Sequence, residues 1–297
     1  MRLYSTTSAA ASRFCLMRFY TDSFDTYNGP SKRSGFVTAY QLDLSTDEIG
    51  RIVNFLGYGR PSAPVWFMGI EEGLGNMNSQ DISENLKARA SFEDTMDLRE
   101  AHMRLRERGR PIDIENQPPS TQVWQWMAKI MLAHKGYEDW SDLVSAKEDI
   151  RSRARKHIQS CAKKYIQYQL GRSNGNTFLT ELSPIPTAKT TDQSFMSWFK
   201  ENDTELDAKI RRRRDELRRM LKENHQSLVI CYGYGNGGDR AREFADFLGV
   251  VWQSVPDCQE VCRSSDSKRL LLPFFGNGQM SYSVFVDLIR SGLLGQS

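Results

Sequence analysis

The sequence predicts an α/β fold with a central parallel sheet and helices on both of its faces. Several short runs are continuously apolar, which is typical of strands buried on both faces of a sheet. Longer segments with apolar residues at helical spacing separate these runs, as expected when helices connect parallel strands. No shift in composition marks a linker. We therefore expect a flexible segment at 1–21, followed by one α/β domain at 22–297 with a charged insertion at about 80–117.

The first half of the chain has two helical patterns and one strand. Ser45 is a candidate N-cap for a helix at Thr46–Leu56. The run Ala63–Gly69 predicts a buried strand that ends in a glycine turn. Residues 80–117 are strongly charged, and we expect them to be exposed. After Pro118-Pro119-Ser120, the next helix has an apolar stripe at Val123, Trp126, Met127, Ile130 and Met131.

The second half continues the alternation of helices and strands. Helices are expected at Ala146–Leu170, Asp207–Asn224 and Ser281–Ser291. Strands are expected at Asn176–Thr180, Leu228–Tyr232, Val250–Trp252 and Leu270–Leu272. The arginine run at Arg211–Arg214 lies on the second of these helices, and we expect it to face solvent because charge runs usually do.

The composition is that of a globular protein. Of the 297 residues, 39% are hydrophobic and 26% are charged, which excludes collagen-like and fully disordered classes. No apolar run is long enough to span a bilayer. Five cysteines without a Cys-x-x-Cys motif favour a reducing compartment. Cys258 and Cys262 are interpreted as structural thiols, and no bound metal or cofactor is expected.

The N-terminal segment permits two interpretations. Residues 1–17 carry Arg2 and Arg13 and no carboxylate, as transit peptides do. The alternative is an upstream start codon, with Met17 as the effective first residue, and this is slightly favoured. A bacterial cytoplasmic location is expected in the second case, and a mitochondrial or nuclear location in the first.

The candidate catalytic and binding residues lie directly after the predicted strands, because open parallel sheets bind ligands beyond the carboxyl ends of their strands. Three of the four segments combine glycines with polar groups, and one pairs a carboxylate with prolines. These segments are Gly69–Gly75, Glu181–Pro186, Gly233–Gly238 and Pro273–Ser281.

The ordered set of VWFMGIEEG, FLTELSPIP, LVICYG and LLPFFGNGQMS resembles the uracil-DNA glycosylase superfamily over Pro64–Leu293. The resemblance implies a three-layer α/β/α sandwich with a central parallel sheet. It also implies a DNA glycosylase, a hydrolase that flips a base out of DNA, cleaves its N-glycosidic bond and leaves an abasic site. The implied partner is double-stranded DNA, with a monomeric enzyme that has no membrane association. The cysteine spacing of the superfamily's iron–sulfur members is absent.

Two glutamates are candidates for the group that positions the attacking water. Glu71 stands in the place of the family's water-positioning residue, and Glu72 replaces the usual proline, so either could serve. A carboxylate there can hold water and stabilise an oxocarbenium-like state. The structural alternative for Glu71 is a helix N-cap. The family's histidine has no counterpart in the last loop, where Asn277 and Gln279 are available as amide donors.

The base is expected to meet Glu181, which stands in the place of the asparagine that reads uracil, and Phe274 or Phe275. An ionised carboxylate accepts hydrogen bonds, which suits the amine of cytosine and opposes the carbonyl of uracil. A helix cap or salt bridge is the structural alternative. With Glu181 in this place, the sequence resembles an antiphage branch of the superfamily that excises glucosylated hydroxymethylcytosine from phage DNA. α-Glucosylated hydroxymethylcytosine is therefore the expected substrate.

DNA contacts are expected from the loops and from the insertion. Gly73 and Gly75 permit close approach of the backbone to DNA, and Ser281 lies in the last loop. Insertion arginines are candidate phosphate contacts: Arg104, Arg106, Arg108 and Arg110.

Three alternatives stay open. One is a glycosylase for uracil or a damaged base, and another is a non-catalytic nucleic-acid-binding module. The third is an NAD-dependent oxidoreductase, because Gly233, Gly235 and Gly238 form Gly-x-Gly-x-x-Gly with Asp257 about twenty residues later. Few residues follow Gly238, which weighs against a dinucleotide fold.

Overall fold

The structure is a computed structural model, and it describes residues 42–74, 79–107, 110–111, 113–116, 121–136, 140–187, 193–234, 239–276 and 278–295. The chain divides into two compact units, residues 1–34 and 35–297, and all described residues belong to the second. The segment expected to be flexible at 1–21 lies outside the described residues. It includes residues 1–17, for which a transit peptide and an upstream start codon are the two interpretations.

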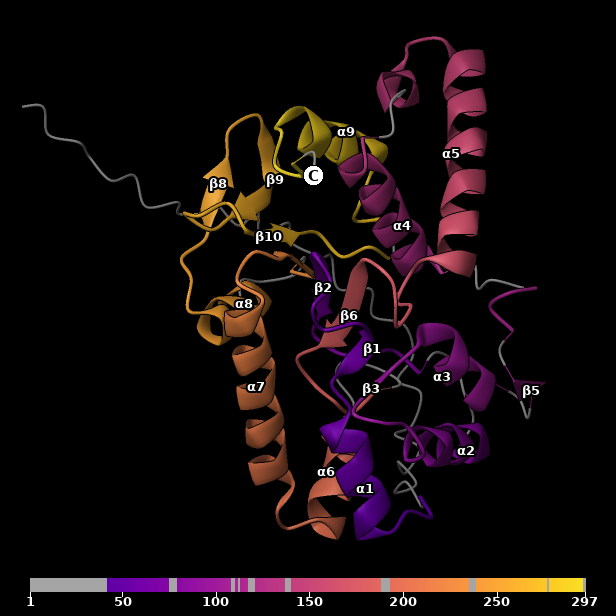
Figure 1. The fold of residues 1–297 in the computed structure, drawn as a ribbon, viewed down its shortest axis with the longest axis vertical. Helices are drawn as coiled ribbons and strands as arrows, with labels where there is room; N and C mark the ends of the chain where they lie inside the picture. The colour runs from indigo at the N-terminus through magenta and orange to yellow at the C-terminus, as the bar shows by residue number, and fades with distance from the viewer. Residues whose placement is uncertain are drawn as a thin grey trace, which may run out of the picture. The chain divides into compact units, whose positions relative to one another are not determined.

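An eight-stranded sheet forms the centre of the described part of the chain, with the order β3-β1-β6-β2-β7-β10-β9-β8 (Figure 1). Its strands are β1 (Gly57–Gly59), β2 (Val65–Gly69), β3 (Thr95–Met96), β6 (Thr177–Glu181), β7 (Leu228–Tyr232), β8 (Gln253–Val255), β9 (Cys258–Arg263) and β10 (Arg269–Leu272). A separate two-stranded ribbon consists of β4 (Arg106–Glu107) and β5 (Arg110–Pro111). The α/β class is confirmed.

The sheet is mixed, however, which corrects the expectation of a parallel one. β6, β2, β7 and β10 are parallel neighbours in the middle. On the two sides, β1 pairs antiparallel with β6, and β9 pairs antiparallel with β10 and β8. Val250–Trp252 is not a strand. The chain instead forms a β8–β9 hairpin, and hairpins produce antiparallel pairs because no helical crossover is needed.

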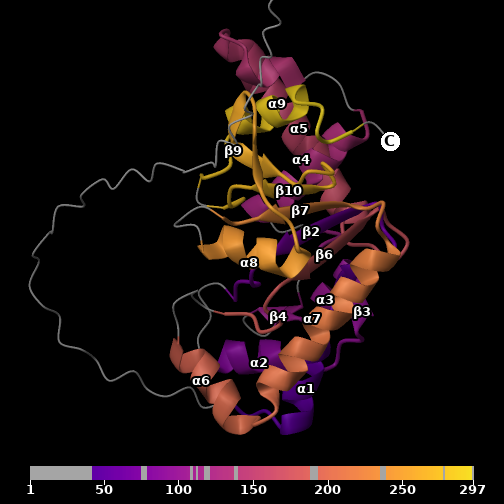
Figure 2. The ribbon, with the colours of Figure 1, turned by 90° about the vertical axis from the view of Figure 1, so that its left-hand side faces the viewer.

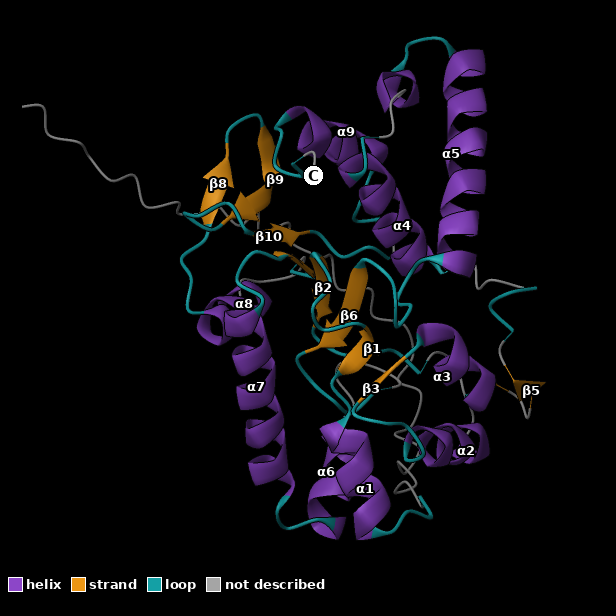
Figure 3. Cartoon of the chain, in the orientation of Figure 1, coloured by secondary structure: helices purple, strands orange, loops and turns teal. Residues whose placement is uncertain are grey.

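Helices pack on both faces of the sheet (Figure 3). Their bounds are α1 (Thr46–Asn54), α2 (Ser79–Arg89), α3 (Leu98–Arg104), α4 (Gln122–His134), the 3-10 helix η1 (Trp140–Val144), α5 (Glu148–Tyr168), α6 (Gln193–Asn202), α7 (Leu206–Glu223), α8 (Asp239–Leu248) and α9 (Tyr282–Arg290). Alternate strand residues face opposite sides. Phe67 and Tyr232 pack with α4, α5 and α9, whereas Trp66 and Met68 pack with α7 and α8, which lie in front of the sheet in Figure 2.

The charged segment at 80–117 is not simply exposed. Ile82 and Leu86 of α2 are buried, as are Leu98 and Ala101 of α3. The two buried residues are four positions apart in α2 and three positions apart in α3. Each helix therefore presents one narrow apolar face between charged residues. The α3 residues belong to the same core as the sheet strands. The prediction of exposure is wrong because these narrow stripes suffice to dock two helices.

Helix ends agree with the capping signals. Ser45 forms a capping box with Glu48 at the start of α1, and Ser281 accepts the Val284 N–H at the start of α9. The cap of α4 is Thr121, whose side chain accepts the Trp124 N–H. Within the described residues, no helix combines the length and the apolar character that a bilayer crossing requires.

Candidate functional site

A cavity of about 430 Å³ lies at the carboxyl ends of β2, β6 and β7. It brings together five of the residues proposed from the sequence: Glu71, Glu72, Gly73, Glu181 and Phe274. Across the sheet, the four parallel strands lie in the order β6, β2, β7, β10, whereas β2 precedes β6 in the chain. The connections that leave β2 and β7 therefore lead in opposite directions, and ligand crevices form beside such a switch point.

Backbone hydrogen bonds fix the loop after β2 to the loop after β6. The Leu182 N–H donates to the Gly69 carbonyl at 2.9 Å, and the Ser183 N–H donates to the Ile70 carbonyl at 2.6 Å. Further along, the Thr187 N–H donates to the Glu72 carbonyl at 3.0 Å. The two loops thus continue the parallel pairing beyond the strands. This pairing holds Glu71 and Glu181 at the same end of the sheet.

Glu72 belongs to a part-buried ion pair with Arg89. Arg89 of α2 donates two hydrogen bonds to its carboxylate, at 2.8 and 2.9 Å, and the Tyr58 hydroxyl donates a third at 3.1 Å. Asn85 accepts the Arg89 Nε–H at 2.8 Å. Burial acts to raise the pKa of Glu72, but the charge and hydrogen bonds of Arg89 outweigh it and hold that pKa below its usual value. Of the two glutamates, the geometry favours Glu71 for the water.

Glu71 lines the cavity and is half-buried. Burial raises its pKa, opposed by a hydrogen bond with the Thr187 side chain and by the charge of Arg240. The N-cap alternative is wrong, since the next helix, α2, begins only at Ser79. A carboxylate with a raised pKa is a better proton acceptor than an ordinary glutamate.

Glu181 is the last residue of β6, and its carboxyl group lies over Gly69. A methyl group added at Gly69 would overlap Glu181 Oε2, so a larger residue there would displace the Glu181 carboxyl group. The Tyr232 hydroxyl donates to Glu181 Oε1 at 2.7 Å. Oε2 is buried and has no hydrogen-bond partner among the described residues. No described cation forms a salt bridge with Glu181.

Burial raises the pKa of Glu181 to about 8, and the Tyr232 hydrogen bond only partly opposes this. At neutral pH the group is therefore mainly a neutral carboxylic acid, with Oε2 as a hydrogen-bond donor. This raised pKa argues against the expectation of an ionised, accept-only carboxylate. A protonated Glu181 can donate to a carbonyl oxygen, so its charge no longer argues against uracil.

His102 and Arg213 line the same cavity and were missed from the sequence. His102 is 6% exposed and meets the edge of Trp124 at 4.8 Å between ring centroids. Neither ring nitrogen has a hydrogen-bond partner among the described residues, and burial lowers the pKa of His102 to about 4. It is thus a neutral imidazole at the cavity wall, with one N–H to donate.

Arg213 is an exception to the expectation that the arginine run faces solvent, whereas Arg211 and Arg212 are exposed as expected. It is 4% exposed, and it donates to the Phe55 carbonyl at 2.6 Å. Two longer hydrogen bonds of 3.4 Å reach the carbonyls of Leu182 and Leu56. Arg213 thereby holds the loop before β1 to the loop after β6. A positive charge at this wall also favours anionic character in whatever the cavity holds.

The remaining candidates whose side chains are described do not line the cavity. Phe275 stacks on Tyr232 at 4.7 Å and supports the ring that holds Glu181. Gln279 and Ser281 do not line it, and Ser281 serves as the α9 cap. Arg104 is exposed and donates to the Ser91 carbonyl. Arg106 and Arg110 belong to the β4–β5 ribbon, and their side chains are outside the described part. Gly75, Arg108 and Asn277 lie outside the described residues altogether.

The nicotinamide alternative fits the fold poorly. Gly235 and Gly238 lie outside the described residues, but Asp257 is described. It occupies the turn between β8 and β9 with a φ of 62°. A ribose-binding carboxylate is expected at the end of a neighbouring parallel strand, not in an antiparallel hairpin turn.

Two further observations complete the description. Among the described residues, no group of three or more His, Cys, Asp or Glu side chains is arranged to hold a metal ion. When compared with known proteins, the chain matches no family model, no curated protein and no solved structure.

Proposed function

We propose that this protein is a DNA glycosylase that hydrolyses the N-glycosidic bond of a flipped pyrimidine and leaves an abasic site. One observation carries the proposal. Glu71 and Glu181, two carboxyl groups with raised pKa values, line one cavity at the carboxyl ends of the parallel strands. Two such groups supply the base and the acid that glycosidic hydrolysis needs.

Glu71 acts on the water. In its ionised form it accepts a proton from water as the water oxygen bonds to the sugar C1′. Its negative charge also stabilises the oxocarbenium character that develops while the bond to the base breaks. The Thr187 side chain and the charge of Arg240 favour the ionised form.

Glu181 acts on the leaving base. When the C1′–N1 bond breaks, its electron pair passes to the base, and protonated Glu181 donates to the negative charge that develops there. The neutral His102 imidazole offers a second donor without repelling a cationic sugar. Tyr58, Trp124 and Phe274 line the cavity as well, and aromatic faces suit a stacked base.

The proposed substrate is α-glucosylated hydroxymethylcytosine in double-stranded phage DNA, and it is supported by the sequence resemblance to the antiphage branch rather than by the charge of Glu181. With Glu181 protonated, discrimination against uracil depends on the shape of the cavity rather than on the charge of this residue. Uracil therefore belongs in the test as a competing substrate.

The test measures free bases by mass spectrometry after incubation with matched duplexes that carry glucosylated hydroxymethylcytosine, hydroxymethylcytosine, uracil or cytosine. Hot alkali then cleaves the strand at abasic sites. Release should proceed without added cofactor, and Glu71→Gln should lower the single-turnover rate by about 10²–10⁴-fold. Glu201→Gln, which changes an exposed glutamate of α6, is the matched control and should keep the parental rate.

Three outcomes would contradict the proposal. Absence of base release from every duplex, with DNA binding retained, would indicate a non-catalytic binding module. Saturable binding of NAD would support the oxidoreductase. Full activity of Glu71→Gln would remove Glu71 from the mechanism.

A further inference from the structure

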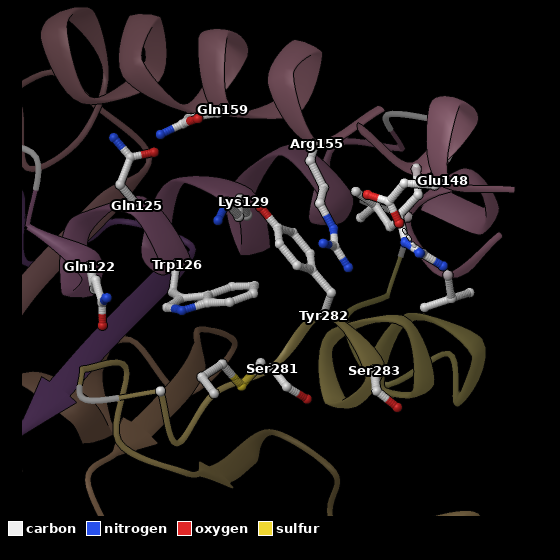
Figure 4. A pocket seen from close by; sticks show the side chains of 15 residues that line it. Gln122, Gln125, Trp126, Lys129, Glu148, Arg155, Gln159, Ser281, Tyr282 and Ser283 are labelled. Carbon is white, nitrogen blue, oxygen red and sulfur yellow. Dashed lines mark hydrogen bonds and ion pairs between the residues drawn. The ribbon is translucent and has the colours of Figure 1, made fainter. Parts of the chain in front are cut away.

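A second and larger hollow, of about 890 Å³, lies between α4, η1, α5 and the start of α9 (Figure 4). It faces a different side of α4 from the cavity described above. Gln122, Gln125 and Lys129 border the groove and share one face of the helix at i, i+3 and i+7. Val123, Trp124 and Met127 border the cavity from the opposite face. The two sites therefore have separate walls.

Lys129 is the central feature of the groove. Its side chain is 6% exposed, although lysines are rarely buried without a partner. The Nζ atom lies 4.0 Å from the centre of the Trp126 ring and 4.7 Å from that of Tyr282. No hydrogen bond or ion pair joins it to another described residue. The two rings stabilise the ammonium group, but neither neutralises its charge.

Other polar groups of the groove are also unsatisfied. Arg155 of α5 lies 5.0 Å from the Tyr282 ring, and its buried Nε–H has no acceptor among the described residues. Gln125 is 8% exposed, and its Oε1 atom has no donor there. Arg151, by contrast, forms an ion pair with Glu148. Two cations, Lys129 and Arg155, therefore remain uncompensated around one hollow.

The start of α9 adds to this positive character. Gly278, Ser281 and Ser283 line the groove, and Figure 4 shows Ser281 and Ser283 at its edge beside Tyr282. The first N–H groups of a helix carry partial positive charge. They therefore reinforce the two side-chain cations, which come from two other elements.

We propose that this groove binds a small phosphorylated molecule whose phosphate oxygens reach the Lys129 ammonium and the Arg155 guanidinium past the edge of the Tyr282 ring, which lies between the two cations (Figure 4). Such a ligand would neutralise both cations and give the Arg155 Nε–H an acceptor. The volume is in the range of small-molecule sites and exceeds what a phosphate alone needs, so the ligand carries an organic part as well. The depth of Lys129 favours a free molecule over the backbone of DNA. The inference does not depend on the proposed function.

Isothermal titration calorimetry of the full chain with inorganic phosphate, pyrophosphate and the four deoxynucleoside monophosphates tests the proposal. At least one mononucleotide should bind saturably and more tightly than inorganic phosphate. Lys129→Met and Arg155→Gln should each weaken that binding about tenfold or more, because each removes a charged contact. Lys156→Met, which removes an exposed charge of α5 outside the groove, is the matched control and should bind as the parent does.

Circular dichroism shows whether each variant is folded, and Arg155→Gln gives a second result if Lys129→Met fails to fold. The proposal is overturned if none of these phosphates binds, or if both groove variants bind as tightly as the parent. It is also overturned if a DNA duplex binds through Lys129 and Arg155 while every small phosphate fails to bind.

Discussion

The two faces of α4 border sites that hold different ionisable groups, and a comparison of them shows how burial selects protonation states. Each site contains one completed ion pair, Arg89–Glu72 in the cavity and Arg151–Glu148 in the groove. Each also keeps ionisable groups outside its pair. In the cavity these are carboxyl groups such as Glu181, and in the groove they are cations such as Lys129.

Burial favours the neutral form of the carboxyl groups in the cavity and of the cations in the groove alike. It raises the pKa of Glu181 to about 8 and lowers that of Lys129 to about 8. Near neutral pH the consequences differ. Glu181 is mainly neutral and able to give a proton, whereas Lys129 is mainly charged and able to attract an anion. The same desolvation thus suits one site to proton transfer and the other to binding.

The largest expected effect concerns the completed pair of the cavity. Arg89→Met leaves the part-buried Glu72 carboxylate with Tyr58 as its main partner, and we expect a loss of about 3–5 kcal/mol in the free energy of unfolding. Urea denaturation measures it. Adding Glu72→Gln to Arg89→Met should recover part of the loss, since no uncompensated charge then remains.

Lys87→Met is the matched control, because Lys87 lies on the same helix and pairs with Asp43 where both side chains are exposed. Its unfolding curve should stay close to the parental one. Equal losses for the two variants, or no recovery in the double variant, would show that Arg89 contributes by packing rather than by neutralising Glu72.

The sequence predicts the local parts of this comparison. Strands β2, β6, β7 and β10 are found within one or two residues of their expected bounds because their apolar runs are short and continuous. Glu71 and Glu181 follow from those strand ends. The mixed sheet does not follow, because the β8–β9 hairpin depends on pairing with β10 rather than on local pattern.

Arg89, His102 and Arg213 were missed for a related reason. All three are charged or polar residues on helices that look solvent-exposed by composition, and only tertiary packing buries them. A signal exists for Arg213. It falls between Leu206 and Leu217 on the buried face of α7, at the spacing of that stripe. Position on an apolar stripe, rather than residue type, identifies it.

The second prediction concerns the pH dependence of stability from the cavity. The pKa of Glu181 is about 8 in the folded protein and 4.5 as a free side chain, so the folded state holds its proton more tightly. Its contribution to stability is complete below pH 4.5 and is lost as the pH rises to 8. We expect a decline of about 2–3 kcal/mol relative to Glu181→Gln, because water in the cavity screens part of the shift.

Urea denaturation of both proteins between pH 4.5 and 8.5 measures this difference. Tyr232→Phe is a useful companion, because the hydrogen bond to Oε1 lowers the pKa of Glu181, and its removal should extend the decline to higher pH. Parallel stability curves for the parent and Glu181→Gln would mean that Glu181 is ionised in the fold, as first expected from the sequence.

The smallest effect has the opposite sign and comes from the groove. Lys129→Met should raise the free energy of unfolding at pH 7 by about 1–2 kcal/mol, because it removes a buried charge and the contacts with Trp126 and Tyr282 offset only part of its desolvation. The pKa of Lys129 is about 8 in the folded protein and 10.5 as a free side chain. Between these values the unfolded chain holds more protons, so the stability of the parent rises with pH. The advantage of the Met variant should therefore shrink from pH 8 to 10.5, in contrast to the decline that Glu181 causes below pH 8. If Lys129→Met is instead less stable than the parent at pH 7, the aromatic contacts outweigh desolvation, and the charge of Lys129 is a structural requirement of the α4–α9 interface.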